Sequence, residues 1–226
     1  MSKKQLIIWI CTGIILVILA GCSNKNEEKS IEERDDEAVD EQMEENAKTD
    51  HPDDLPLSDF FLSDGKKASF KGDGDEFATF SLTFHHLDDQ HIAIDEDNGG
   101  SLVRRIFKVE QERIVIISEQ IIDQDEPLPS IESLAGLTTQ YIFLEKPIKE
   151  GHSFGGWTIA ELNSTVETPY KTFDNAIKLE MIDHGFKNIT YIVPQFGEVL
   201  RESIMENEDG KDFIITSSLQ SVEDEE

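Results

Sequence analysis

The sequence contains one dense group of residues that could bind a metal ion. His85 and His91 flank a short turn, and Asp95 and Asp97 follow within the same region. Imidazole and carboxylate groups together are common metal ligands. If the strands beside this turn pair as a hairpin, His85 and His91 would approach each other. However, the spacing matches no zinc motif, so an exposed acidic loop is the favoured interpretation. No metal or other cofactor is predicted.

A glycine-rich loop at residues 151–157 is the segment most typical of an active site. Its glycines would let a ligand approach, His152 would offer a base, and Trp157 would stack on the ligand. A loop that leads into a core tryptophan is the favoured interpretation of the same residues. Catalysis would also require a carboxylate or a second base within hydrogen-bonding distance of His152.

Established catalytic motifs are missing from the sequence. It contains neither a G-x-S-x-G nucleophile elbow nor a Walker loop. We therefore predict a protein that is not an enzyme, and we assign no catalytic residue.

The charge of the chain excludes other classes of partner. It has 48 acidic and 20 basic residues, which gives a formal net charge of −28. Binding to nucleic acid requires clustered lysine and arginine, so no nucleic acid partner is predicted. Electrostatic docking on anionic lipid is disfavoured for the same reason.

The N-terminus has the pattern of an export signal. Lys3 and Lys4 precede an apolar run that begins at Leu6 and ends at Ala20. This run is shorter than the roughly 20 residues that span a bilayer. A basic start, a short apolar segment and small residues before a cleavage site are typical of a secretory signal.

The end of this run, Leu19-Ala20-Gly21-Cys22, resembles a bacterial lipobox. The resemblance implies that Cys22 receives a diacylglycerol and that a signal peptidase cuts between Gly21 and Cys22. It also implies a protein anchored in the cell membrane that faces the extracytoplasmic side. Two acyl chains are enough for stable anchoring. Loss of Lys3 and Lys4 with the signal would change the net charge from −28 to −30.

Cysteine content bounds the chemistry of the mature chain. Cys11 lies in the signal and Cys22 would become a thioether, so no disulfide or thiolate metal site is expected. An extracytoplasmic domain without disulfides favours the surface of a Gram-positive cell.

Composition divides the chain into three segments. Residues 1–21 form the predicted signal helix, and residues 22–56 form an acidic tether that is too polar to bury a core. Residues 57–226 have the turns and alternation of a β-rich domain. Possible halves of this domain are 57–122 and 140–220, joined by a connector with one helical turn.

Alternation of apolar and polar residues predicts an all-β domain. Glycine-containing turns separate the segments, and Asn98-Gly99-Gly100 is a strong hairpin signal. We expect an antiparallel meander that forms a curved sheet, a half-barrel or a sandwich. The predicted strands are 67–71, 77–85, 90–95, 102–109, 113–120, 141–144, 157–162, 176–182, 186–193, 198–205 and 213–219.

A second resemblance covers roughly residues 151–205. The segment Thr165–Glu180 is similar to one that recurs in uncharacterised secreted bacterial lipoproteins, with the pattern V-x-T-P-x-G-T-F-x-N before an alternating strand. The chain departs from this pattern at Lys171, where glycine is usual. The resemblance implies a strand–turn–strand module in a curved antiparallel sheet, and it implies no catalytic residue. The matching residues are Val166, Thr168, Pro169, Thr172, Phe173 and Asn175, followed by Tyr191, Pro194, Gly197 and Val199.

These features predict a lipid-anchored envelope protein whose β domain is a non-catalytic binding or interaction module. Its partner would be another envelope protein. The alternative is a carrier of an apolar ligand within the curved sheet. An apolar cavity between the two halves would favour the carrier, whereas a filled core would favour the interaction module. A hydrolase that uses the His152–Trp157 loop is a third alternative.

Overall fold

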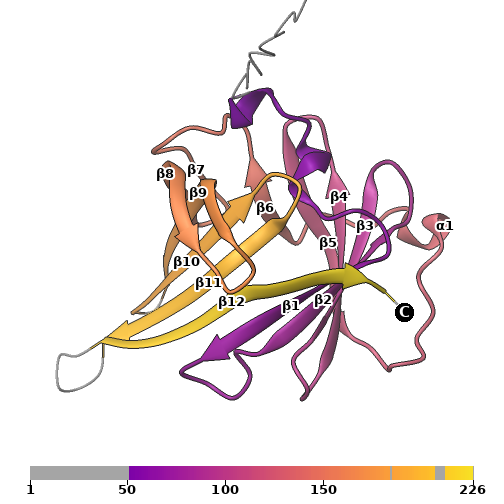
Figure 1. Cartoon of the computed structure of the whole chain (residues 1–226). Helices are drawn as coiled ribbons and strands as arrows, with labels where there is room; N and C mark the ends of the chain where they lie inside the picture. The colour runs from indigo at the N-terminus through magenta and orange to yellow at the C-terminus, as the bar shows by residue number, and fades with distance from the viewer. Residues whose placement is uncertain (1–50, 184, 207–211, 226) are drawn as a thin grey trace, which may run out of the picture. The chain divides into compact units, whose positions relative to one another are not determined.

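All strands of the computed structural model, which describes residues 51–183, 185–206 and 212–225, belong to one antiparallel sheet (Figure 1). The twelve strands have the order β6-β5-β4-β3-β2-β1-β12-β11-β10-β9-β8-β7. Strands β1–β6 and β7–β12 are therefore two meanders, which the pairing of β1 with β12 joins. Their bounds are β1 (Lys66–Asp73), β2 (Phe80–His86), β3 (His91–Asp97), β4 (Leu102–Val109), β5 (Arg113–Ile121), β6 (Tyr141–Glu145), β7 (Ser153–Phe154), β8 (Trp157–Glu167), β9 (Thr172–Asp183), β10 (Phe186–Val193), β11 (Gly197–Glu206) and β12 (Asp212–Asp224).

The two ends of this sheet approach each other, so the meander is nearly closed into a barrel. Gly155, beside β7, has a positive φ of 52°. A Cβ atom at Gly155 would stand 3.2 Å from the carbonyl oxygen of Ile142 in β6. Glycine therefore permits the close approach of the two edge strands of the sheet, β6 and β7. The predicted all-β antiparallel fold is confirmed, in its half-barrel form.

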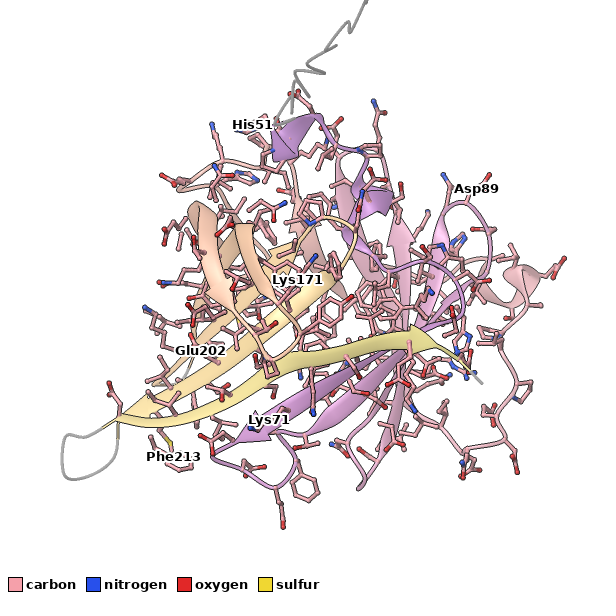
Figure 2. The ribbon with its side chains drawn as sticks, viewed as in Figure 1. His51, Lys71, Asp89, Lys171, Glu202 and Phe213 are labelled. Carbon is pink, nitrogen blue, oxygen red and sulfur yellow. The ribbon has the colours of Figure 1, made fainter. Side chains whose placement is uncertain are left out.

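Burial explains why these segments form strands. In β2, Phe80, Leu82 and Phe84 alternate with less buried residues and point into the core. This period of two matches a strand with one buried face. Side chains from both meanders occupy the space inside the curved sheet (Figure 2).

Strand β5 is buried on both faces, as its continuous apolar run predicts. Ile114 and Ile116 face the main core, whereas Val115 and Ile117 belong to a smaller outer cluster. The short helix α1 (Ile131–Leu134), in the connector between β5 and β6, covers that outer face with Leu134. Removal of apolar surface from water on both sides stabilises this interior strand.

An N-terminal strap, residues 51–62, closes one side of the interior. It contains two short 3-10 helices, η1 (Pro52–Asp54) and η2 (Leu57–Phe60), and Phe60 is fully buried. Lys146 donates hydrogen bonds to the carbonyl oxygens of Asp53 at 2.6 Å and Leu55 at 3.1 Å. Contacts with the sheet therefore begin ahead of Leu57, within the segment assigned to the tether.

Two local features differ from the sequence prediction. The glycine-rich loop predicted at 151–157 contains the two-residue strand β7, which pairs with the start of β8 at Trp157. The turn in the Thr165–Glu180 module is short, because β8 runs to Glu167 and β9 begins at Thr172. Phe173 and Ile177 are buried in the core. Strand β6 pairs with β5, so residues 141–145 belong to the first meander.

Candidate functional site

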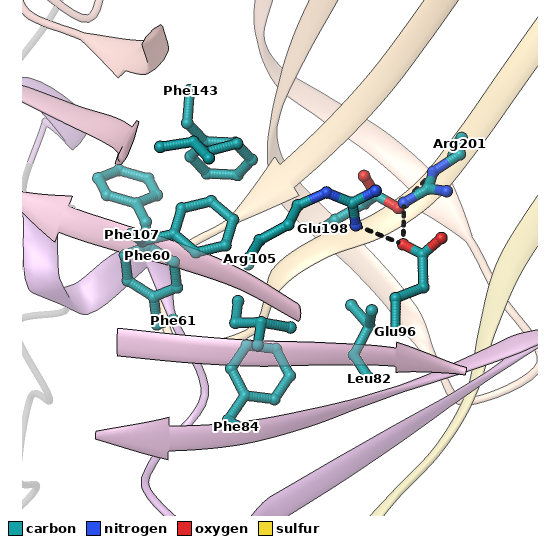
Figure 3. Close-up of a pocket in the computed structure, with 13 residues that line it drawn as sticks. Phe60, Phe61, Leu82, Phe84, Glu96, Arg105, Phe107, Phe143, Glu198 and Arg201 are labelled. Carbon is teal, nitrogen blue, oxygen red and sulfur yellow. Dashed lines mark hydrogen bonds and ion pairs between the residues drawn. The ribbon is translucent and has the colours of Figure 1, made fainter. Parts of the chain in front are cut away.

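A cavity of about 140 Å³ lies between the two meanders (Figure 3). Strands β2 to β6 supply one side, β11 supplies the other, and the N-terminal strap forms part of the wall. The lining residues are Phe60, Phe61, Leu82, Phe84, Ile94, Glu96, Arg105, Phe107, Ile116, Phe143, Gly197, Glu198 and Arg201.

One end of the cavity is apolar and aromatic. Phe107 is in edge-to-face contact with Phe61 at 5.4 Å and with Phe143 at 5.3 Å between ring centroids. Such pairs stabilise a defined ring arrangement beyond simple burial. An apolar protein cavity of about 150 Å³ can bind benzene. This cavity is therefore large enough for a ligand group the size of one aromatic ring.

The other end carries charged side chains that alternate in sign, visible in Figure 3. Arg105 contacts Glu119 at 2.6 Å and Glu96 at 2.9 Å. Arg201 contacts Glu96 at 3.3 Å and Glu198 at 2.9 Å. These five ion-paired side chains form a continuous series in space, which we call the alternating chain: Glu119–Arg105–Glu96–Arg201–Glu198.

A β-bulge places two members of the alternating chain side by side. Ile192 pairs with Glu198, but Tyr191 pairs with Leu200, so Val199 is an extra residue in β11. Residues three positions apart in a regular strand point to opposite faces. The bulge instead turns Glu198 to the side of Arg201. The Arg201 guanidinium also stacks over the Phe80 ring, with its carbon 4.5 Å from the centroid.

Burial and charge shift the two cavity carboxyls in opposite directions. Burial raises the pKa of Glu198 above its ordinary value, and nearby Glu96 adds to this, while Arg201 opposes it. Burial also acts to raise the pKa of Glu96, but Arg201 and Arg105 together outweigh it and hold that pKa below its ordinary value. Glu96 is therefore the well-compensated acid and Glu198 the poorly compensated one.

The residues predicted as possible metal ligands have other partners. His91 Nδ1 lies 2.9 Å from Asp88 Oδ1, and Asp95 accepts two hydrogen bonds from Arg104, each at 2.7 Å. His85 Nε2 stands 3.8 Å from Asp95 Oδ2.

Asp97 accepts a hydrogen bond from the Gly99 amide within the turn that follows β3. Over residues 51–183, 185–206 and 212–225, no group of three or more His, Cys, Asp or Glu side chains is arranged to hold a metal ion.

His152 and Trp157 lie on either side of β7. Glu145 Oε1 is 3.6 Å from His152 Nε2, which exceeds the span of about 2.7–3.2 Å of a hydrogen bond of this type. His152 Nε2 is buried and has no hydrogen-bond partner among the described residues, and Trp157 packs against the core. In this geometry, Glu145 therefore does not supply the hydrogen-bonded carboxylate that a hydrolase using His152 would require.

Sequence reasoning missed the charged residues of the cavity. A signal was present for Glu96. In an alternating strand, this residue lies on the same face as Ile92 and Ile94, so the sequence places a charge at a core position. No such signal existed for Glu198, because the bulge that turns it inward is a feature of strand pairing.

The lipobox residues Gly21 and Cys22 lie outside the described residues. Within the part of the chain that is described, no helix has the length and apolar character needed to cross a membrane.

Comparison with known proteins assigns no family, because no family model and no curated protein matches the chain. A solved structure from Bacteroides fragilis, described as an exported protein with a YmcC-like fold, is similar to it. The similarity covers 73% of this chain and 98% of that one, with a TM-score of 0.43 and 10% sequence identity.

Proposed function

We propose that the β domain is a ligand-binding module that an acylated Cys22 holds at the extracytoplasmic face of the cell membrane. Its ligand would be a small molecule with an apolar group of about one aromatic ring. The observation that carries this proposal is the cavity of about 140 Å³ between the two meanders, aromatic at one end and charged at the other. The proposal requires no catalysis.

The cavity changes the order of the two main alternatives. An apolar cavity between the halves was the feature expected of a carrier, and a filled core was the feature expected of an interaction module. The observed cavity is apolar at one end and charged at the other. Apolar walls with a few placed polar groups are typical of small-molecule sites. Docking of another envelope protein stays a prediction.

Filling the cavity should weaken ligand binding. Ile116 lies in the cavity wall, so Ile116→Trp should weaken binding of benzyl alcohol at least about tenfold. Isothermal titration of the full chain in lipid nanodiscs, with empty nanodiscs subtracted, would measure this.

Ile121→Trp is the matched control, since Ile121 is on the same strand and is 77% exposed. It should bind benzyl alcohol as the unmodified chain does. Equal binding by the Ile116 and Ile121 variants would mean that benzyl alcohol binds elsewhere, and the proposal would fail.

The lipid anchor is tested separately. Cys22→Ala should abolish incorporation of labelled palmitate and leave the signal uncleaved, because the acceptor thiol is gone. Cys11→Ala should keep the label, since Cys11 lies within the signal. Palmitate labelling of the Cys22 variant would contradict the lipobox assignment.

A further inference from the structure

The alternating chain has one more acid than base. Its three carboxylates, on Glu119, Glu96 and Glu198, share two guanidiniums, on Arg105 and Arg201. Each guanidinium lies between two carboxylates, so its positive charge is already matched. The surplus charge at this end of the cavity is therefore negative.

Glu198 is the end of the alternating chain that faces the cavity. Its only ion-pair partner within the described residues is Arg201, whereas Glu96 has both Arg201 and Arg105. Its side chain is 13% accessible, and it forms part of the cavity lining. A group bound in the cavity can therefore approach this carboxylate.

The remaining walls also suit a positive charge. The cavity is lined by five phenylalanines, whose ring faces attract cations, most strongly where water is excluded. The protein already uses this contact nearby, where Arg201 stacks over Phe80. The net charge of −28 adds a long-range potential that draws cations toward the domain.

We propose that the ligand is an amphipathic cation, with an amine or quaternary ammonium group beside Glu198 and an apolar body among Phe84, Phe107 and Phe143. This inference rests on the proposed ligand-binding function. A cation at this position completes the alternating chain as its sixth member. An anionic ligand would instead compete with carboxylates for guanidiniums that are already paired.

The titration behaviour of Glu198 supports this assignment. Its pKa is raised mainly by burial, with Glu96 adding to the effect and Arg201 and Arg105 opposing it. Glu119 lies beyond Arg105 at the other end of the alternating chain. A bound cation would favour the ionised carboxylate and so lower the raised pKa of Glu198.

Three probes of similar size and different charge test the inference: benzylamine, benzyl alcohol and benzoate. Isothermal titration of the full chain in nanodiscs should show benzylamine binding about tenfold more tightly than benzyl alcohol, and benzoate binding most weakly. Glu198→Gln should bring the ratio of the amine and alcohol affinities close to one. Glu110→Gln, at an acid that pairs with Arg113 on the β4–β5 turn, should keep the original ratio.

A second measurement needs no variant. In a series of pH values that starts at 4.5, there should be a range in which the heat of benzylamine binding depends on the ionisation enthalpy of the buffer, because the bound cation lowers the raised pKa of Glu198 and its proton is released. The heat of benzyl alcohol binding should not depend on the buffer. The preference for the amine should grow as the pH rises above 4.5, the ordinary pKa of a glutamate.

The outcomes separate the two proposals. Equal affinities for the three probes, or a preference for benzoate, would overturn the cationic ligand while leaving the binding cavity intact. Binding of none of the probes would overturn both proposals. A preference for benzylamine that survives in Glu198→Gln would show that Glu198 is not the recognising group.

Discussion

Arg201→Met should lower the free energy of unfolding by about 3 kcal/mol at neutral pH. The substitution leaves Glu96 and Glu198 inside the sheet without the guanidinium they share. Removing one partner of a buried ion pair typically costs about 3–5 kcal/mol, since the other charge is left uncompensated. The lower end applies because 37% of the Arg201 side chain is accessible, so water screens part of the interaction.

The cost of this substitution should shrink on acidification. Glu96 has a lowered pKa in the folded protein, so its ion pairs add stability above pH 4.5, its ordinary value, and this stability is lost as the pH falls. In the variant both carboxyls can become neutral by protonation, which removes the penalty of burying them.

Urea unfolding at several pH values measures the stability difference. Arg113→Met is the control, because Arg113 forms an ion pair with Glu110 at an exposed turn. That variant should leave the free energy of unfolding nearly unchanged. If the Arg201 and Arg113 variants were equally stable at neutral pH, the alternating chain would have no structural role.

Phe70→Ala should lower the free energy of unfolding by about 3–5 kcal/mol. Phe70 is 1% exposed and stacks on Phe80 with ring centroids 4.5 Å apart. It lies in β1, which pairs with β2 on one side and with β12 on the other and so joins the two meanders. Loss of this ring removes apolar contacts at the junction and leaves a void.

Denaturant unfolding of the full chain, followed by tryptophan fluorescence, would measure the effect. Phe77→Ala is the matched control, since Phe77 is 52% exposed, and a change within about 0.5 kcal/mol is expected there. A loss below about 1 kcal/mol for Phe70→Ala would mean that the junction is not a principal source of stability.

The fold could be predicted from sequence wherever local pattern decides structure. Residues 80–85 alternate strictly, and Asn98-Gly99-Gly100 encodes a turn, so the strands around them were expected. The choice among a curved sheet, a half-barrel and a sandwich could not be made from the sequence. It depends on the approach of Gly155 to Ile142 across the sheet ends, which no local pattern records.

The candidate site was largely hidden from sequence analysis for a related reason. Histidines and acids at 85–97 attract attention by their density, yet His91 pairs with Asp88, and Asp95 pairs with Arg104. Glu198 becomes a cavity residue only because Val199 forms a bulge. Sites that strand pairing assembles across distant segments have no spacing signature in the chain.

A crystal structure of the full chain soaked in benzyl alcohol would test the ligand-binding cavity most directly. The proposal predicts density for one ring beside Phe84, Phe107 and Ile116, with the hydroxyl toward Glu198. It also predicts that the soaked Ile116→Trp variant shows no such density. Two results for the unmodified protein would contradict it: a cavity that is empty or filled by repacked side chains, or benzyl alcohol density only at the outer surface.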